Sequence, residues 1–307
     1  MPTGEGAYFR VNDMVRNCAT GEMMKVVSLT GDNLTVTRAI GGVTAVTSAS
    51  AAQLLITGNA SAQGADLGTE KVTVRVLGFN YTQIFRNPFT FTNTEVEIET
   101  YGVGDPMNEI AKKAVEHKRA LENSLFFGAR GFTSAAPNSV GYMGGATEFI
   151  STNVFSSIGT LTRKVLDADL QAIYQRGSKN KVIFAAPTPA AALSGLLADN
   201  WVRSTPGETL YGAKVNAFVT GAYGDHVPVI VKREWGALAT ANNQYGSYMI
   251  VVDLDYVSKR PLRNRGTSLL RNRQGNGQDR VTHEYLTEMS LEFAVEKAHG
   301  ILRGITG

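Results

Sequence analysis

The stretch from Asp105 to Gly128 carries the sequence signals for both ends of one long helix. Asp105 can accept hydrogen bonds from the free amides of a first turn, and Pro106 fits there because its missing N–H needs no partner. Apolar residues then recur at helical steps, namely Met107, Ile110, Ala111, Ala114, Val115, Ala120, Leu121 and Leu125. Gly128 offers a left-handed stop. The pattern predicts a helix about 33 Å long, a spine that spans the molecule.

Composition excludes several classes of protein. The chain has 307 residues with 43% hydrophobic content, which is enough for one large or two to three modest domains. A net charge of +3 is too small to predict nucleic-acid binding from the whole-chain field. The single cysteine, Cys18, excludes an internal disulfide framework. Because no apolar run approaches the roughly 18 residues of a membrane span, we expect no membrane partner.

The first hundred residues have the pattern of β structure. Short β-prone runs between residues 8 and 58 predict a small antiparallel sheet or barrel, with a hairpin turn at residues 31–33. Residues 59–69 have the composition of an exposed connector. Further β runs are expected at residues 71–79, 79–89 and 94–102, the last with alternating acidic residues on its outer face.

The second half has a mixed α and β pattern. A helix is expected over residues 160–176, with Leu161, Val165, Leu166, Leu170 and Ile173 on one face. Strands are expected at residues 181–186, 214–220, 227–232 and 248–255, and a further helix at Pro187. A final strand from Val281 to Glu296 has mainly apolar residues at one parity. Glutamates at the other parity face water or a partner; they are Glu284, Glu288, Glu292 and Glu296.

The chain offers few parts for catalysis. The four histidines have no metal-ligand spacing, and the nucleotide and nucleophile motifs are absent. Asp253 and Asp255 fall on the same side of a strand and could bind a cation, although aspartates at a strand's exit are more often turn formers. We therefore expect no enzyme, no cofactor and no metal.

A basic run is the more informative feature. Residues 256–278 contain six cations and no acid, namely Lys259, Arg260, Arg263, Arg265, Arg271 and Arg273. They can form a solvated loop, pair with carboxylates of neighbouring copies, or contact phosphates. The acidic row Glu95, Glu97 and Glu99 and the row of glutamates near the C-terminus favour contacts between copies over contacts with phosphate.

An aromatic stretch before the long helix also calls for a second surface. Residues 80–101 contain more aromatic surface than a lone hairpin can bury; the side chains are Tyr81, Ile84, Phe85, Phe89 and Phe91. If the second surface belongs to another copy, Tyr81, Phe85 and Phe89 are interface anchors and Arg86 is their charged companion. The alternative is packing against the chain's own N-terminal β module.

Several segments in order along the chain resemble tailed-bacteriophage major capsid proteins with the Hong Kong 97 type fold. They are NYTQIFRNPF at residues 80–89, YGVGD before the long helix, GGATEFISTN at residues 144–153, VVDLDYVSKRPLR at residues 251–263 and HEYLTEMSLEFAVEKAHGILRG at residues 283–304. The early stretch GEMMKVVSLTGDNLTVTRAIGG is similar to a β module found near the start of such proteins. The resemblance implies an α+β capsid fold with a long spine helix, an extended β loop, an axial domain and a small N-terminal β module.

The resemblance also implies a domain division. Residues 1–68 form the β module, 69–104 the extended loop, 105–154 the peripheral domain with the spine helix and 155–255 the axial domain. Residues 256–307 form the basic loop and strands that return to the peripheral domain. Family members commonly have an N-terminal arm, whereas here the β module begins almost at Met1, so either an upstream piece is omitted or this version is short.

The function implied is non-enzymatic self-assembly. Copies form hexamers and pentamers that close an icosahedral head around double-stranded DNA, with portal and decoration proteins as further partners. The protein is then part of the virion capsid and is assembled in the host cytoplasm. An encapsulin-like shell is the first alternative, distinguished by a cargo-binding interior, and an enzyme of unrelated class is the second.

Overall fold

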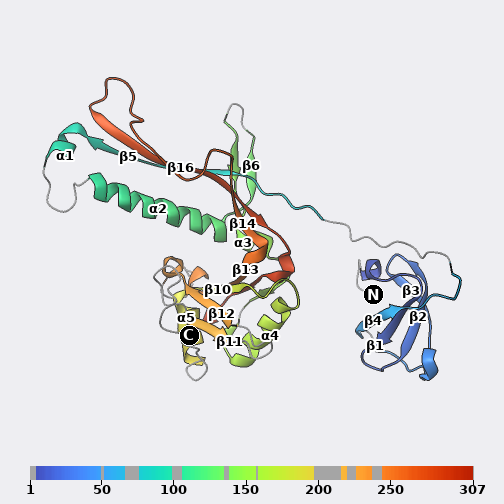
Figure 1. The fold of residues 1–307 in the computed structure, drawn as a ribbon. Helices are drawn as coiled ribbons and strands as arrows, with labels where there is room; N and C mark the ends of the chain where they lie inside the picture. Colours follow the sequence, from blue (N-terminus) through green and yellow to red (C-terminus); the bar gives the residue numbers. More distant parts are fainter. Residues whose placement is uncertain are drawn as a thin grey trace. The chain divides into compact units, whose positions relative to one another are not determined.

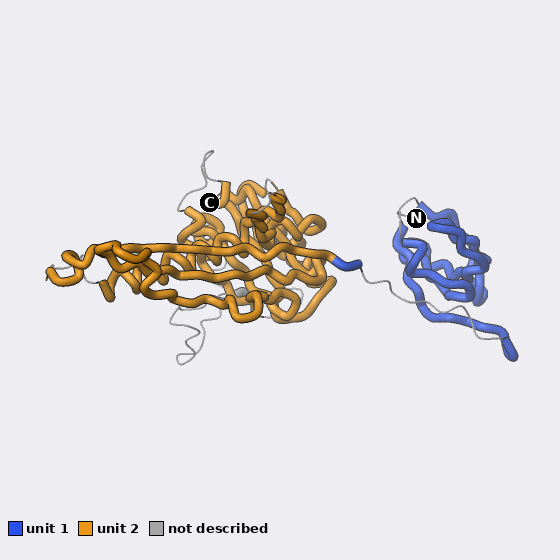
Figure 2. Tube along the Cα trace, turned by 90° about the horizontal axis from the view of Figure 1, so that it is seen from above, with its two compact units in different colours: residues 1–77 blue, residues 78–307 orange. Residues whose placement is uncertain are grey.

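The structure, a computed structural model, describes residues 5–49, 52–65, 76–98, 106–134, 138–156, 158–196, 216–219, 226–236 and 244–306. The chain divides into two compact units, Met1–Leu77 and Gly78–Gly307, which are coloured separately in Figure 2. The five-part domain division implied by the resemblance stays a prediction. None of the helices in the described ranges combines the length and apolar character that a bilayer crossing requires.

The first unit is the small antiparallel sheet that the N-terminal pattern predicts. Its strand order is β3-β2-β1-β4, and the strands are β1 (Asp13–Asn17), β2 (Met23–Thr30), β3 (Asn33–Thr37) and β4 (Leu54–Asn59). The expected hairpin joins β2 to β3, and Gly31 takes a positive φ of 60° in its turn. Phe9, Val15 and Val26 form the buried centre of this unit.

The long helix is confirmed as α2 (Pro106–Phe127) in the second unit, and its expected N-cap, Asp105, lies outside the described residues. The prediction that Gly128 stops the helix in a left-handed conformation is wrong, because Gly128 is not among the residues with positive φ. A glycine is required there because a side chain would not fit. A Cβ atom on Gly128 would lie 2.3 Å from the carbonyl oxygen of Met143.

A long antiparallel sheet lies on α2 (Figure 1). Its central strand is β16 (Arg280–Phe293), which pairs along ten residues with β5 (Gln83–Thr92). On its other side β16 pairs with β14 (Val257–Pro261) and β15 (Ser268–Leu270). The expected return of the C-terminal strand to the long helix is confirmed, because the hydroxyl of Tyr285 on β16 donates to the carbonyl oxygen of Ile110 on α2 at 3.3 Å.

The second sheet of this unit has the order β11-β12-β10-β13-β17-β8. Its strands are β8 (Val154–Phe155), β10 (Lys181–Ala185), β11 (Asn216–Val219), β12 (His226–Val231), β13 (Met249–Asp253) and β17 (Gly300–Leu302). Helices α4 (Arg163–Tyr174) and α5 (Pro187–Leu196) contribute to one hydrophobic cluster, and Phe126 of α2 contributes to another. Alternate residues of β13 belong to the two clusters, so β13 is covered on both faces and is buried along its whole length.

Smaller elements complete the second unit. They are α1 (Asn93–Glu97), the hairpin β6 (Gly131–Thr133) and β7 (Val140–Tyr142), α3 (Ala146–Phe149), and the pair β9 (Gly159–Thr160) and β18 (Ile305–Thr306). Short 3-10 turns lie between them, including η3 (Arg233–Trp235), η4 (Gln244–Ser247), η5 (Leu254–Tyr256) and η6 (Glu296–Ala298).

Three strand predictions are wrong in part. Residues 93–97 form the helix α1, because the hydroxyl of Thr92 accepts a hydrogen bond from the amide of Glu95 and caps a helical turn there. Residues 76–79 of the expected strand at 71–79 are not in a strand, and residues 71–75 lie outside the described ranges. The final strand ends at Phe293, because Val295 takes a left-handed conformation with φ 49°.

Candidate functional site: the charged sheet over helix α2

The structure places the described residues of the expected site on one sheet and its connections. Tyr81 precedes β5, and β5 carries Phe85, Arg86 and Phe89. The remaining ones lie on α1 and on β14 and its following loops, namely Glu95, Glu97, Arg260, Arg263, Arg265, Arg271 and Arg273. Glu99 lies outside the described residues. The intersubunit role of these residues stays a prediction.

An ion pair joins the two longest strands. The guanidinium of Arg86 on β5 contacts both carboxylate oxygens of Glu284 on β16, with Nη2 2.9 Å from Oε2. Glu284 is only 4% exposed. The Arg86 guanidinium lowers the pKa of Glu284, because it donates hydrogen bonds to the ionised form. The expectation that this glutamate faces water or a partner is therefore wrong, since an arginine of the same chain covers it.

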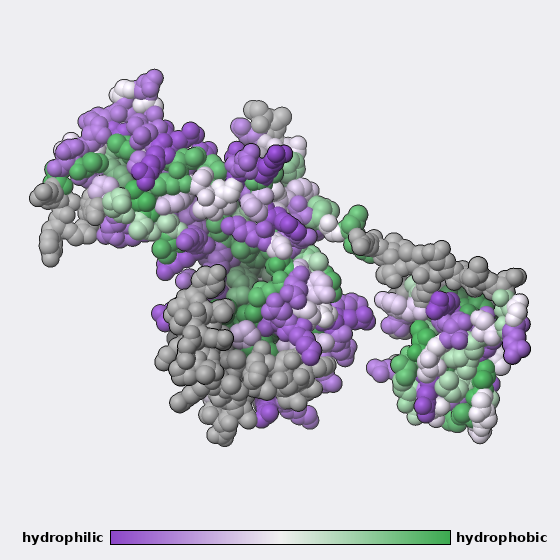
Figure 3. Space-filling model, viewed as in Figure 1, coloured by the Kyte–Doolittle hydropathy of each residue, from purple (hydrophilic) through white to green (hydrophobic). Residues whose placement is uncertain are grey.

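Two further pairs continue this charged face. Arg265 Nε lies 2.5 Å from Oε2 of Glu288, whose side chain is 11% exposed, and Arg260 contacts Glu292. The glutamates are spaced four residues apart on β16, so they share one face of the strand. Three of the expected interface arginines thus already bind carboxylates of their own subunit. Figure 3 shows hydrophilic residues predominating over this part of the molecule.

The opposite face of the sheet is aromatic and buried against α2. Phe85 is 8% exposed and packs in a cluster with Leu121 of α2 and Met289 of β16. Phe89 is 7% exposed, and its ring centroid lies 6.1 Å from that of Tyr285. The second surface required by these aromatics is therefore the C-terminal strand and the long helix of the same chain. The alternative of the N-terminal module does not hold for these two side chains.

His117 is the polar centre of this packed layer and is fully buried. Its Nδ1 lies 2.9 Å from the side-chain oxygen of Asn87, and its Nε2 lies 2.7 Å from the hydroxyl of Thr287. Nδ1 therefore donates to the oxygen of Asn87, and the Thr287 hydroxyl donates onward to the hydroxyl of Thr267 at 2.9 Å. Burial, and then the nearby Lys259, lower the pKa of His117. The two nitrogens of this ring join α2 to β5 and β16.

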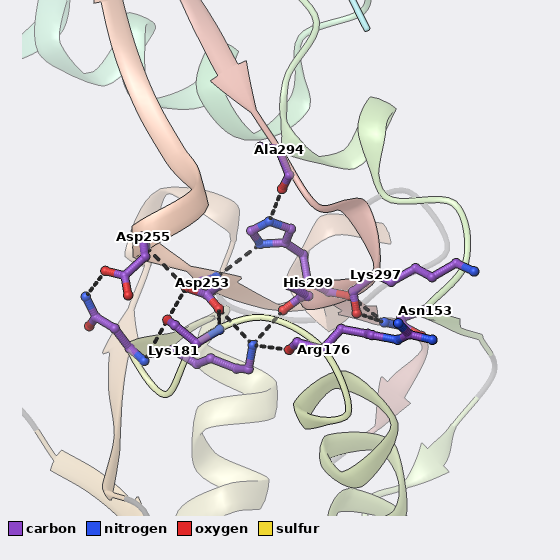
Figure 4. Close-up of polar contacts among 11 residues, drawn as sticks. Asn153, Arg176, Lys181, Asp253, Asp255, Ala294, Lys297 and His299 are labelled. Atoms are coloured by element: carbon purple, nitrogen blue, oxygen red, sulfur yellow. Dashed lines mark hydrogen bonds and ion pairs between the residues drawn. The ribbon is translucent and has the colours of Figure 1, made fainter. Parts of the chain in front are cut away.

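A second buried polar group lies where the two sheets are connected (Figure 4). Lys181 Nζ donates to Asp253 Oδ2 at 3.0 Å and to the carbonyl oxygens of Arg176 and Ala298. Its three protons are thus all used. Asp253 also accepts hydrogen bonds from the amide and hydroxyl of Ser178. The carboxylate of Asp253 binds the ammonium group of Lys181, so it is not free to bind a metal cation. This favours the interpretation of Asp253 as a structural residue at the end of its strand.

The connection from β16 to β17 crosses the same region. His299 Nδ1 accepts from the amide of Asp253 at 3.1 Å, and its Nε2 therefore donates to the carbonyl oxygen of Ala294 at 3.0 Å. Glu296 accepts from the amides of Ser151 and Thr152. The glutamate that sequence parity assigned to a strand face is thus an anchor for the turn at η6. In the described part of the chain, no group of three potential ligands is placed to hold a metal ion.

Sequence reasoning missed one surface. Phe79 and Phe132 are 61% and 53% exposed, although both are large aromatic residues. The ring of Tyr81 lies between them, with centroid distances of 5.5 Å and 5.3 Å. Tyr81 was expected at an interface, but its neighbours were not. Phe79 and Tyr81 lie far from Phe132 in the sequence, and the close packing of Gly141 on β7 against Thr82 places the hairpin beside them.

The fold is shared with solved capsid and encapsulin subunits. The capsid protein of a native GTA particle matches with a TM-score of 0.50 and 12% identity, over 80% of each chain. The SrpI encapsulin of Synechococcus elongatus PCC 7942 matches with a TM-score of 0.51 and 13% identity, over 73% of this chain and 74% of that one. At such identities these matches concern the fold alone.

The family follows from the sequence match. The family model of the SU10 major capsid protein covers residues 15–306, so the chain belongs to this family. The major capsid protein of Pseudomonas phage PaMx41 is 32% identical over 113 residues, which are 36% of this chain and 27% of that protein. The aligned part therefore spans well under half of that relative's length.

Proposed function

We propose that copies of this chain assemble into the icosahedral head of a tailed phage. The observation that carries the proposal is the match of the SU10 major capsid protein model to nearly the whole chain. Hexamers and pentamers form the shell, which encloses double-stranded DNA and carries the portal and decoration proteins. Assembly takes place in the host cytoplasm. The chain acts without catalysis, in keeping with a family of structural proteins.

The charge pattern supports two different roles for the arginines, one within the subunit and one between subunits. Arg86, Arg260 and Arg265 pair with glutamates of their own subunit and stabilise the sheet. Among the described residues, no carboxylate is within ion-pair distance of the exposed cations Arg263, Arg271 or Arg273. These three arginines therefore contact carboxylates of neighbouring copies, and phosphate contact is secondary. Exposed guanidinium groups are suited to both partners.

The test is microscopy of the purified protein. Negative-stain images are expected to show closed shells, whereas a population of monomers would contradict the proposal. The triple variant Arg263→Ala, Arg271→Ala, Arg273→Ala is expected to assemble poorly even without DNA. Lys164→Ala, Lys179→Ala, Arg233→Ala is the matched control, because it removes the same charge elsewhere. Normal empty shells from the arginine variant, with a defect only in DNA content, would assign these arginines to DNA.

An encapsulin-like compartment is the second candidate, favoured by the similarity in fold to the SrpI encapsulin. The two functions differ in what the shell encloses. Shells purified from infected cells are expected to contain nuclease-protected double-stranded DNA. A protein cargo in place of DNA would favour the compartment.

A further inference from the structure

An aromatic strip runs along unit 2 where the chain enters it and continues onto the β6–β7 hairpin. We define it by Phe79, Tyr81, Phe132 and Arg130. The guanidinium carbon of Arg130 lies 4.8 Å from the ring centroid of Phe79, and Arg130 Nη1 donates to the carbonyl oxygen of Phe79 at 2.9 Å. Phe79 contacts Tyr81 edge-on, and Tyr81 stacks on Phe132. The strip is therefore ordered by its own contacts.

The strip lacks the cover that such side chains normally have. Phe79 and Phe132 expose more than half of their surface, and a two-stranded hairpin is marginally stable by itself. Gly141, opposite Phe132, is packed so closely that a Cβ atom there would lie 2.4 Å from the carbonyl oxygen of Thr82. The base of the hairpin is thus held against the chain while the ring of Phe132 stays outside. Clustered exposed aromatic residues mark contact surfaces.

The strip also carries an uncompensated charge. Within the described ranges no carboxylate lies at ion-pair distance from Arg130. Its position over Phe79 and within 5.7 Å of the Phe149 ring centroid fixes the guanidinium at the edge of the apolar surface. A complementary partner would bring aliphatic side chains for the rings and a carboxylate for Arg130.

Helix α1 and the residue after it offer such a combination of aliphatic and acidic side chains. Val96 and Ile98, in and directly after the helix, are 42% and 55% exposed. Glu95 and Glu97 are exposed as well, and neither forms an ion pair with a described residue. Thr92 caps the helix, so its short turn is a formed element that presents two aliphatic residues and two carboxylates together.

The strip and α1 cannot meet within one subunit. Helix α1 lies beside the start of α2 and the β6–β7 hairpin beside its end (Figure 1). Helix α2 has 22 residues and is therefore about 33 Å long. The two surfaces are complementary in charge and in apolar character but lie at opposite ends of this helix. Another copy of the chain can bring the two surfaces together.

We infer that the aromatic strip of one subunit binds α1 of a second subunit, with Arg130 paired to Glu95 or Glu97. The contact is head-to-tail, because the two surfaces differ, and a head-to-tail contact generates closed rings when its rotation closes. The inference rests on the proposed shell function and names the segments that meet in it. It also gives Glu95, Glu97 and Tyr81 specific partners.

Charge reversal tests the contact. Arg130→Glu is expected to lower the yield of capsomers and shells at least about ten-fold, because it places like charges together. Glu95→Arg, Glu97→Arg should have the same effect. The variant that combines all three substitutions is expected to recover assembly. Sedimentation velocity separates subunits, capsomers and shells, and circular dichroism checks that each variant is folded.

The combined variant controls for damage to the subunit itself, because it still lacks the contacts of Arg130 with Phe79 and Phe149. Phe132→Ser is a second probe that should impair assembly of a folded subunit, with Leu262→Ser, at a side chain 43% exposed, as its control. Normal shells from Arg130→Glu, or defects that the combined variant does not relieve, would overturn the inference. Failure of the unmodified protein to assemble would instead contradict the proposed function.

Discussion

Lys181 Nζ lies 3.0 Å from Asp253 Oδ2, and both side chains are completely buried. Lys181 begins β10 and Asp253 ends β13, and the two residues are directly paired in the sheet. Lys181 also binds the carbonyl oxygen of Ala298, in the turn that leads from β16 to β17. One ammonium group therefore ties the central sheet to the segment that connects it with the sheet over α2.

Replacing this lysine should be costly. Lys181→Met leaves the carboxylate of Asp253 buried without its cation, and breaking a buried pair in this way costs about 3–5 kcal/mol. Urea denaturation measures the free energy of unfolding. The double variant Lys181→Met, Asp253→Asn should recover part of the loss, because it removes the uncompensated charge. A loss below about 1 kcal/mol in the single variant would contradict the assigned role.

Stability should fall as the pH drops below about 6.5, the usual pKa of histidine. Burial lowers the pKa values of His117 and His299 in the folded subunit. The unfolded chain therefore takes up protons first, so the stabilisation is complete above the unfolded pKa and is lost as pH falls toward the folded pKa. The limiting slope is about 1.4 kcal/mol per pH unit for each histidine. Urea denaturation between pH 7.5 and 5.5 measures it.

A variant isolates the contribution of His117. His117→Gln keeps a polar side chain but removes the titrating group, so its unfolding free energy should depend less steeply on pH. An unchanged slope would show that His117 does not carry this dependence.

Gly128 should not tolerate a side chain. Gly128→Ala places a Cβ atom against the carbonyl oxygen of Met143, which is backbone and cannot move aside cheaply. We expect a loss of about 1–3 kcal/mol in unfolding free energy. Gly78→Ala is the control, since nothing lies within 4 Å of its Cβ position. Equal thermal melting temperatures for the two variants would argue against the close approach at Gly128.

Phe85→Ser should destabilise the subunit itself. The side chain is buried with Leu121 and Met289, and removing a buried phenylalanine costs about 3–5 kcal/mol. Ile84→Ser, one residue earlier and 51% exposed, is expected to change stability little. Thermal unfolding of the soluble subunit compares the two. A stable Phe85→Ser subunit that fails to assemble would instead support the predicted role of Phe85 between subunits.

The sequence by itself determined the elements whose signals are local. The bounds of α2 follow from the run beginning at Pro106 and from its apolar period, because helical hydrogen bonds join residues close in sequence. The hairpin at Gly31 is also local, and β13 was readable from its continuous run of apolar residues. The resemblance to capsid proteins rested on such segments in order, and the family match supports it.

Only the tertiary structure decided which residues cover one another. Parity placed Glu284 on an open face, yet Arg86, 198 residues away, covers it. The sequence indicated that Phe85 needs a second surface without saying which one, and in the structure β16 and α2 provide it. The side chain of Phe132 remains exposed, although the sequence around it gave no sign of this. Burial depends on pairings between distant segments, which local patterns do not specify. The tertiary structure was therefore needed to separate the side chains that are covered within the subunit from those that stay exposed for an interface.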